Sequence, residues 1–150
     1  MRILVIGGTG FISFPVVQQL SLQGHTLLVV HRGQTQANLL PEVQHLLTDR
    51  TRLQENLQDV QRFAPEVVLD MIPYTQQDAQ IVREMFHGLA QRVVAISSGD
   101  VTRAYGRVIG IEPGPVEFVP LTEESSLREQ LYPYRGEQLR SQDDPEHWSL

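Results

Sequence analysis

The sequence predicts an α/β fold built on a doubly wound parallel sheet. Short runs rich in Val, Ile and Leu alternate with longer segments in which apolar residues recur at helical spacing, the pattern of β-α-β units. A glycine-rich turn, residues 7–13, joins the first apolar run to the first helical segment. With right-handed crossovers, five strands arranged in this way predict the sheet order 3-2-1-4-5.

The strands are expected wherever a continuous apolar run suits a strand that is buried on both faces. One of these runs contains a carboxylate, Asp70. Because a buried carboxylate needs hydrogen-bond partners, we expect Asp70 to accept bonds from nearby loop N–H groups rather than to take part in catalysis. The predicted strands are residues 3–6, 26–31, 43–48, 67–72 and 93–96.

The helices are expected between the strands, where apolar residues recur every three or four positions. In the first helix we expect Phe11 and Phe14 to pack into the core rather than to form a stacking platform. The predicted helices are residues 11–23, 51–63 and 76–91.

The chain beyond Ser98 has no clear periodicity. Residues 110–120 contain three prolines and two glycines and are expected to form a loop. Residues 125–140 would suit a helix, but a proline and a glycine interrupt them. We therefore expect 110–150 to be largely loop, within one domain that spans residues 1–150.

The composition excludes several classes of protein. The chain has no cysteine, which rules out disulfides and thiolate metal sites, and none of its five histidines has metal-ligand spacing, so we expect no metal. The N-terminal apolar run is short and continues into glycines without a cleavage site, and no run is long enough to cross a membrane. We expect a cytoplasmic protein without membrane contact, and the net charge of −6 argues against nucleic-acid binding.

The turn Gly7-Gly8-Thr9-Gly10-Phe11-Ile12-Ser13 has the residues that a pyrophosphate site needs. Glycines remove the Cβ atoms that would obstruct the phosphates, and the N-terminus of the following helix offers N–H groups and a favourable dipole. Ser13 takes the third position of the fingerprint, where a small residue still allows close packing of helix on strand. The position between a strand and a helix favours a dinucleotide-binding unit of the Rossmann type over the alternative, a tight turn without a ligand.

The end of the second predicted strand favours NADP over NAD. NAD sites usually place Asp or Glu there to bind the ribose 2′-hydroxyl. This chain has His31-Arg32-Gly33 instead, and no acidic residue precedes Glu42. A guanidinium pairs well with a 2′-phosphate, so we expect Arg32 to select NADP. The alternative for Arg32 is a solvated loop charge.

Together these residues resemble the NAD-dependent epimerase/dehydratase family of extended and atypical short-chain dehydrogenase/reductases. The resemblance implies that the glycine turn holds the pyrophosphate, that Asp49 and Arg50 contact adenine, and that Ile72 lies where the nicotinamide ribose passes. The cofactor-binding residues expected in this chain are Gly7, Gly10, Phe11, Ile12, Arg32, Asp49, Arg50 and Ile72.

The resemblance also implies a catalytic tyrosine followed four residues later by a lysine whose charge lowers the pKa of the tyrosine. Here Tyr134 is followed at that spacing by Gln138, and all twelve basic residues of the chain are arginines. Ser98 and Tyr134 are the residues expected nearest the reacting carbonyl. Ser98 has the alternative of capping the end of a strand.

Members of this family are much longer, so we expect the chain to be the truncated N-terminal part of an oxidoreductase for a small carbonyl or nucleotide-sugar substrate. Loss of a sixth strand would leave the fifth strand as an unpaired edge, and we expect self-association there. The absence of lysine supports an alternative, a non-catalytic NADP-responsive regulatory or RNA-associated protein, provided that the natural chain ends at Leu150.

Overall fold

The computed structural model of the protein describes residues 1–35, 39–117 and 120–130. Contacts within the chain divide it into two compact units, Met1–Ile96 and Ser97–Leu150. Among the described helices, none has the length and apolar character to cross a membrane.

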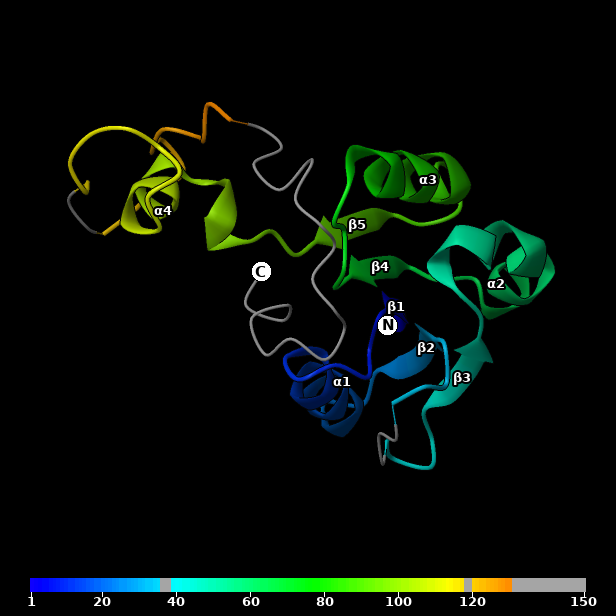
Figure 1. Ribbon diagram of the computed structural model, residues 1–150. Coiled ribbons are helices and arrows are strands. Elements are labelled where there is room, and N and C mark those ends of the chain that lie inside the picture. Colours follow the sequence, from blue (N-terminus) through cyan, green and yellow to red (C-terminus); the bar gives the residue numbers. More distant parts are fainter. Residues whose placement is uncertain (36–38, 118–119, 131–150) are drawn as a thin grey trace. The chain divides into compact units, whose positions relative to one another are not determined.

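The first unit contains a five-stranded sheet in which every pairing is parallel (Figure 1). Its order, β3-β2-β1-β4-β5, confirms the predicted one. The registers place Ile6 at the end of β1 opposite Val30 of β2 and Asp70 of β4, so the carboxyl ends of these strands meet at one edge. The strands are β1 (Arg2–Ile6), β2 (Thr26–His31), β3 (Gln44–Leu47), β4 (Val67–Asp70) and β5 (Arg92–Ala95).

Helices cover both faces of the sheet (Figure 1). Helix α1 (Ser13–Leu22) packs on one face through Val17, beside the inward side chains of β1 and β2. Helices α2 (Leu57–Phe63) and α3 (Gln76–Phe86) pack on the other face. The sheet is thus the middle layer between two apolar clusters, as a doubly wound parallel sheet requires.

Helix α1 begins two residues later than predicted, and this changes its buried face. Its buried residues are Ser13, Val17 and Ser21, four positions apart, whereas Phe11 is 97% exposed in the preceding turn. The prediction that Phe11 belongs to the core was therefore wrong. The reason is that Phe11 lies in the turn before the helix, so it is not part of the face that α1 turns toward the sheet.

The predicted helix 51–63 is a 3-10 helix, η1 (Arg50–Asn56), followed by α2. Strand β4 ends at Asp70, two residues earlier than predicted. The cause is local, because the Asp70 carboxylate accepts the N–H of Ile72 at 3.1 Å and so takes that group out of the sheet ladder. The expected bonding of Asp70 to loop N–H groups is confirmed by this contact.

The second unit contains η2 (Gly99–Val101) and helix α4 (Arg103–Val108), which the sequence analysis missed. Helix α4 is only six residues long, too short for periodicity to reveal. Thr102 caps it by accepting the N–H of Tyr105, and Glu117 accepts bonds from Arg103 and Arg107 at 2.8 Å each. Local caps and ion pairs therefore hold this helix in place of an apolar face.

Candidate functional site at the glycine turn

The first glycine of the turn is fixed by its two neighbouring strands. Gly7 has a φ of +82°, a conformation that residues with a side chain rarely adopt. Its N–H donates to the carbonyl oxygen of Val30 at 2.9 Å. A Cβ atom on Gly7 would lie 2.9 Å from Cγ1 of Ile72, so the loop after β4 packs directly against this glycine.

The second glycine has a packing role. A Cβ atom on Gly8 would lie 2.6 Å from Cγ1 of Val29 and 3.1 Å from Cγ2 of Val17. Gly8 thus allows the start of α1 to approach β2 closely. Gly8 belongs to the glycine turn but is not among the predicted cofactor-binding residues.

Ser13 replaces the third glycine of the fingerprint and closes the turn. Its hydroxyl accepts the N–H of Gly10 at 2.8 Å and donates to the carbonyl oxygen of Gly10 at 3.3 Å. The side chain is buried, and both roles of its hydroxyl are satisfied. The N–H of Phe14 also donates to Gly10, at 2.9 Å, so the turn passes into the helix without a gap.

Helix α1 starts without a side-chain cap and has no acidic residue in its first turn. Elsewhere in the described part of the chain, η1, α3, η2 and α4 each begin with a side-chain cap, supplied by Asp49, Thr75, Ser98 and Thr102. Helix α2, which continues directly from η1, also starts without one, but it has an acidic residue, Asp59, in its first turn. The first N–H groups of a helix have no partner within the helix. At α1 they are therefore disposed to bind an external anion, and the dipole adds to the attraction.

The end of β2 carries two basic groups side by side in sequence, His31 and Arg32. Arg32 is exposed. His31 Nδ1 accepts the N–H of Gly33 at 3.2 Å, so its Nε2–H donates to Nδ1 of His45, 2.9 Å away. Burial lowers the pKa of His31 below its usual value, and the charge on His45 lowers it further. No spacing in the sequence indicates this pair, because the contact depends on the register of β2 and β3.

Asp49 caps η1 at the end of β3. Its carboxylate accepts the N–H and the hydroxyl of Thr51 at 2.9 and 2.8 Å, and these two bonds are the main causes that lower the pKa of Asp49. The charges of Arg32 and Arg50 lower it further. Arg32 and Asp49, both predicted cofactor residues, are therefore near enough for the charge of one to act on the other.

Arg50 is engaged by acidic and carbonyl groups of its own unit. Nη1 and Nη2 donate to the two carboxylate oxygens of Asp70 at 3.1 and 2.9 Å, and Nε lies 3.1 Å from Oδ1 of Asp78. Nη1 also donates to the carbonyl oxygen of Ile72, and Nη2 to that of Asp78. Four of the five N–H groups of the guanidinium are thus hydrogen-bonded within the chain, and Nε is ion-paired with Asp78; the adenine contact expected of Arg50 stays a prediction.

The two predicted catalytic residues are not brought together by described contacts. Ser98 belongs to the second unit, where its hydroxyl accepts the N–H of Asp100 at 3.2 Å and caps η2. Tyr134 and Gln138 lie outside the described residues. No group of three or more metal-ligating side chains occurs among the described residues.

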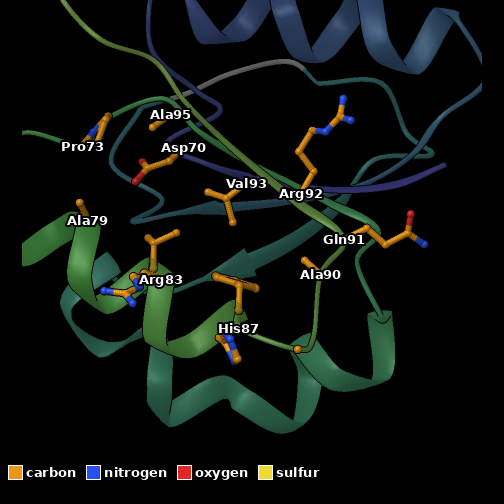
Figure 2. Close-up of a pocket in the computed structure, with 13 residues that line it drawn as sticks. Asp70, Pro73, Ala79, Arg83, His87, Ala90, Gln91, Arg92, Val93 and Ala95 are labelled. Atoms are coloured by element: carbon orange, nitrogen blue, oxygen red, sulfur yellow. The ribbon is translucent and has the colours of Figure 1, made fainter.

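A separate pocket of about 320 Å³ lies between α3 and β5. Figure 2 shows Val93 of β5 pointing toward α3, with Asp70 at the same end of the pocket as Pro73 and Ala95. None of the described residues that line the pocket is a predicted site residue. The glycine turn, not this pocket, therefore carries the features of a nucleotide site.

The parallel sheet, its strand order and the glycine turn define a Rossmann-like fold. The sequence profile of the NAD dependent epimerase/dehydratase family matches residues 3–80, more than half of the chain, and the chain belongs to this family. A curated relative is 2′-dehydrokanamycin reductase of Streptomyces kanamyceticus, which is 33% identical over 124 residues. That match covers 82% of this chain and 32% of the reductase.

Solved structures show the same fold at lower sequence identity. The epimerase Mth375 of Methanothermobacter thermautotrophicus superimposes with a TM-score of 0.68 at 17% identity, over 89% of this chain and 43% of that one. The enzyme WbmG of Bordetella bronchiseptica, solved in complex with NAD, superimposes with a TM-score of 0.65 at 18% identity, over 85% and 44%. The chain thus spans about a third of the curated relative and less than half of these structures.

Proposed function

We propose that this chain is the NADP-binding part of an oxidoreductase of the epimerase, dehydratase or reductase kind, acting on a small carbonyl or nucleotide-sugar substrate. The observation that carries the proposal is the N-terminus of α1, which starts without a cap beside a turn where Gly7 and Gly8 leave no room for a Cβ atom. Family membership and the reductase of Streptomyces kanamyceticus support the proposal.

The pyrophosphate is bound at the start of α1. The N–H of Gly10 is bonded to Ser13, so the N–H groups of Phe11 and Ile12 are the donors for the phosphates. The side chains of Phe11 and Ile12 are exposed beside this position. Gly10 contributes by the absence of a side chain on the approach to the phosphates.

Arg32 binds the 2′-phosphate and thereby selects NADP. It is exposed at the carboxyl end of β2, where NAD sites place an acid. Asp49, at the end of β3, binds the adenine amino group. The nicotinamide supplies hydride transfer when bound, and the chain's part in that step is to orient it, with Ile72 beside the nicotinamide ribose.

Ser98 and Tyr134 are proposed nearest the reacting carbonyl, where Ser98 donates a hydrogen bond and Tyr134 exchanges a proton. Because the chain has no lysine, the cation that would lower the pKa of Tyr134 has to come from another part of a longer protein. Provided that the natural chain ends at Leu150, the same absence favours a second candidate, a non-catalytic regulatory or RNA-associated protein that responds to NADP. Reduction of carbonyl substrates by the full-length protein separates the two, since the second candidate shows binding without turnover.

The test is a titration of the purified chain with NADPH and with NADH, followed by nicotinamide fluorescence and by calorimetry. We expect tighter binding of NADPH, and Arg32→Ala should weaken NADPH by about tenfold to a hundredfold while leaving NADH unchanged. Arg62→Ala is the matched control, because Arg62 is an exposed arginine of α2 that pairs with Asp59. Failure of the wild-type chain to bind either nucleotide would overturn the proposal.

A further inference from the structure

Arg50 occupies a buried position that no cofactor contact explains. Its side chain is 11% exposed, and it lies between the carboxylates of Asp70, 2% exposed, and Asp78. A buried charge is costly unless it is paired and hydrogen-bonded, and this guanidinium is paired with both carboxylates and donates four hydrogen bonds. The cluster links the segment after β3 to the end of β4 and to the first turn of α3.

The cluster holds the backbone of Ile72 through both its N–H and its carbonyl group. The N–H of Ile72 donates to Oδ1 of Asp70, and the carbonyl oxygen of Ile72 accepts from Nη1 of Arg50. Asp78 anchors the far end of the same loop, because its Oδ2 accepts the N–H of Thr75 at 2.9 Å in a capping box. The loop from β4 to α3 is therefore held at its start and at its end by partners of Arg50.

This loop supports the glycine turn. A Cβ atom on Gly7 would lie only 2.9 Å from Cγ1 of Ile72, so the Ile72 side chain packs directly on this glycine. A shift of Ile72 would therefore open or crowd the turn. We propose that Arg50 is a positioning residue that holds Ile72 against the glycine turn and so keeps the nucleotide site in its binding geometry. This inference rests on the proposed nucleotide-binding function.

The proposed role of Arg50 differs from that of Arg32 in a measurable way. Arg32 would act on the 2′-phosphate, which only NADP has. Arg50 would act on the turn that binds the pyrophosphate, which both nucleotides share. Loss of Arg50 should therefore weaken NADPH and NADH by the same factor, whereas loss of Arg32 should change their ratio.

The test compares Arg50→Lys with wild type at a temperature well below unfolding. Lysine keeps the charge, but its three donors on one nitrogen cannot reproduce the guanidinium's contacts with Asp70, Asp78 and the Ile72 carbonyl. We expect both nucleotides to bind about tenfold more weakly or worse, with an unchanged ratio. Arg52→Lys is the matched control, since Arg52 lies on the same 3-10 helix, is 68% exposed and should bind as wild type.

Amide hydrogen exchange supplies the local readout. In Arg50→Lys the N–H groups of Ile72 and Tyr74 should exchange about tenfold faster or more, while the N–H groups of buried β2 residues keep their wild-type rates. Wild-type nucleotide binding in Arg50→Lys, or unchanged exchange at Ile72, would overturn the inference. If Arg50→Lys does not fold, Asp70→Asn replaces it, because asparagine keeps the shape and loses one bond to Arg50.

The two proposals fail in different ways. If the wild-type chain binds neither nucleotide, the proposed function is overturned, and with it the link from Arg50 to nucleotide binding. The exchange rates at Ile72 still decide whether Arg50 holds the loop against the turn. If wild type binds and Arg50→Lys binds equally well, only the inference about Arg50 is overturned.

Discussion

Nε2 of His31 lies 2.9 Å from Nδ1 of His45, so the two imidazoles share one hydrogen bond across β2 and β3. The N–H of Gly33 donates to the other ring nitrogen of His31, which fixes its tautomer. Protonation of His31 would place a proton on Nδ1 opposite the Gly33 donor. The hydrogen bonds of this pair, at the residue before Arg32, therefore suit two neutral rings.

The stability of the chain should depend on this pair at mildly acidic pH. Because the pKa of folded His31 is lower than that of unfolded histidine, the unfolded chain binds more protons in the interval between the two values. The stabilisation is complete above about pH 6.5 and is lost as the pH falls toward the lower, folded pKa. Thermal unfolding at pH 5.0–7.5 should show this loss in wild type. His31→Gln should flatten the dependence of the melting temperature on pH, and His87→Gln, at an exposed position, should leave that dependence as in wild type. Equal pH dependence in wild type and His31→Gln would contradict the role given to His31.

Gly8→Ala should destabilise the fold. The new Cβ atom would meet Cγ1 of Val29 at 2.6 Å, and because Val29 is fully buried, its side chain has no space to move into. Overpacking of this kind costs about 1–3 kcal/mol of the free energy of unfolding. Urea denaturation measures it. Gly99→Ala is the control, because a Cβ atom there meets nothing within 4 Å; equal losses in the two variants would argue against the close contact.

Ser13→Ala should loosen the glycine turn without adding bulk. It removes the acceptor of the Gly10 N–H, a partly buried hydrogen bond whose loss costs about 0.5–1.5 kcal/mol. If the proposed function is right, the affinities for NADPH and NADH should fall together. Calorimetry with both nucleotides, next to urea denaturation, checks the two effects. A variant as stable as wild type would show that Ser13 does not close the turn.

The edge of β5 should make the chain associate with itself. The Ile96 N–H donates to Asp70 of β4, and because backbone groups alternate in direction along a strand, those of Val93 and Ala95 point to the open edge. Val93 and Val94 are 43% and 39% exposed on this strand, an edge strand of the described sheet. Light scattering should detect oligomers that Val94→Lys reduces.

Val108→Lys is the control for this association, because Val108 is an exposed apolar residue of the second unit, away from β5 in sequence. Its oligomers should match those of wild type. A monodisperse monomer at high protein concentration would overturn the prediction.

The sheet could be predicted from the sequence because its strands are nearly continuous apolar runs. For β2 even the bounds, Thr26–His31, agree with the prediction. Where side chains bond to the backbone, local patterns were insufficient. Asp70 ends β4 by capturing the Ile72 N–H, and Thr102 starts a helix that has no apolar stripe.

The same distinction between local patterns and long-range contacts applies to the candidate site. The glycine turn and Arg32 are local in sequence, so the motif alone was sufficient to propose them, and their role stays a prediction. The Arg50 cluster joins residues 20 and 28 positions apart, and the pair of His31 and His45 depends on strand register. Contacts of this kind follow from the tertiary fold and cannot be predicted from local sequence patterns.

The serine-lined contact face of α1 has a consequence for mutational tolerance. Ser13 and Ser21 are buried, and their hydroxyls bond Gly10 and Glu42, so a substitution there is judged by its volume and by the hydrogen bond it loses, and alanine should be accepted more readily than leucine. The apolar Phe11 and Leu22 are exposed and should accept polar residues at little cost. A saturation library of this helix should therefore find apolar Leu22 more tolerant than polar Ser13 and Ser21, whereas buried Val17 should remain restricted to apolar residues.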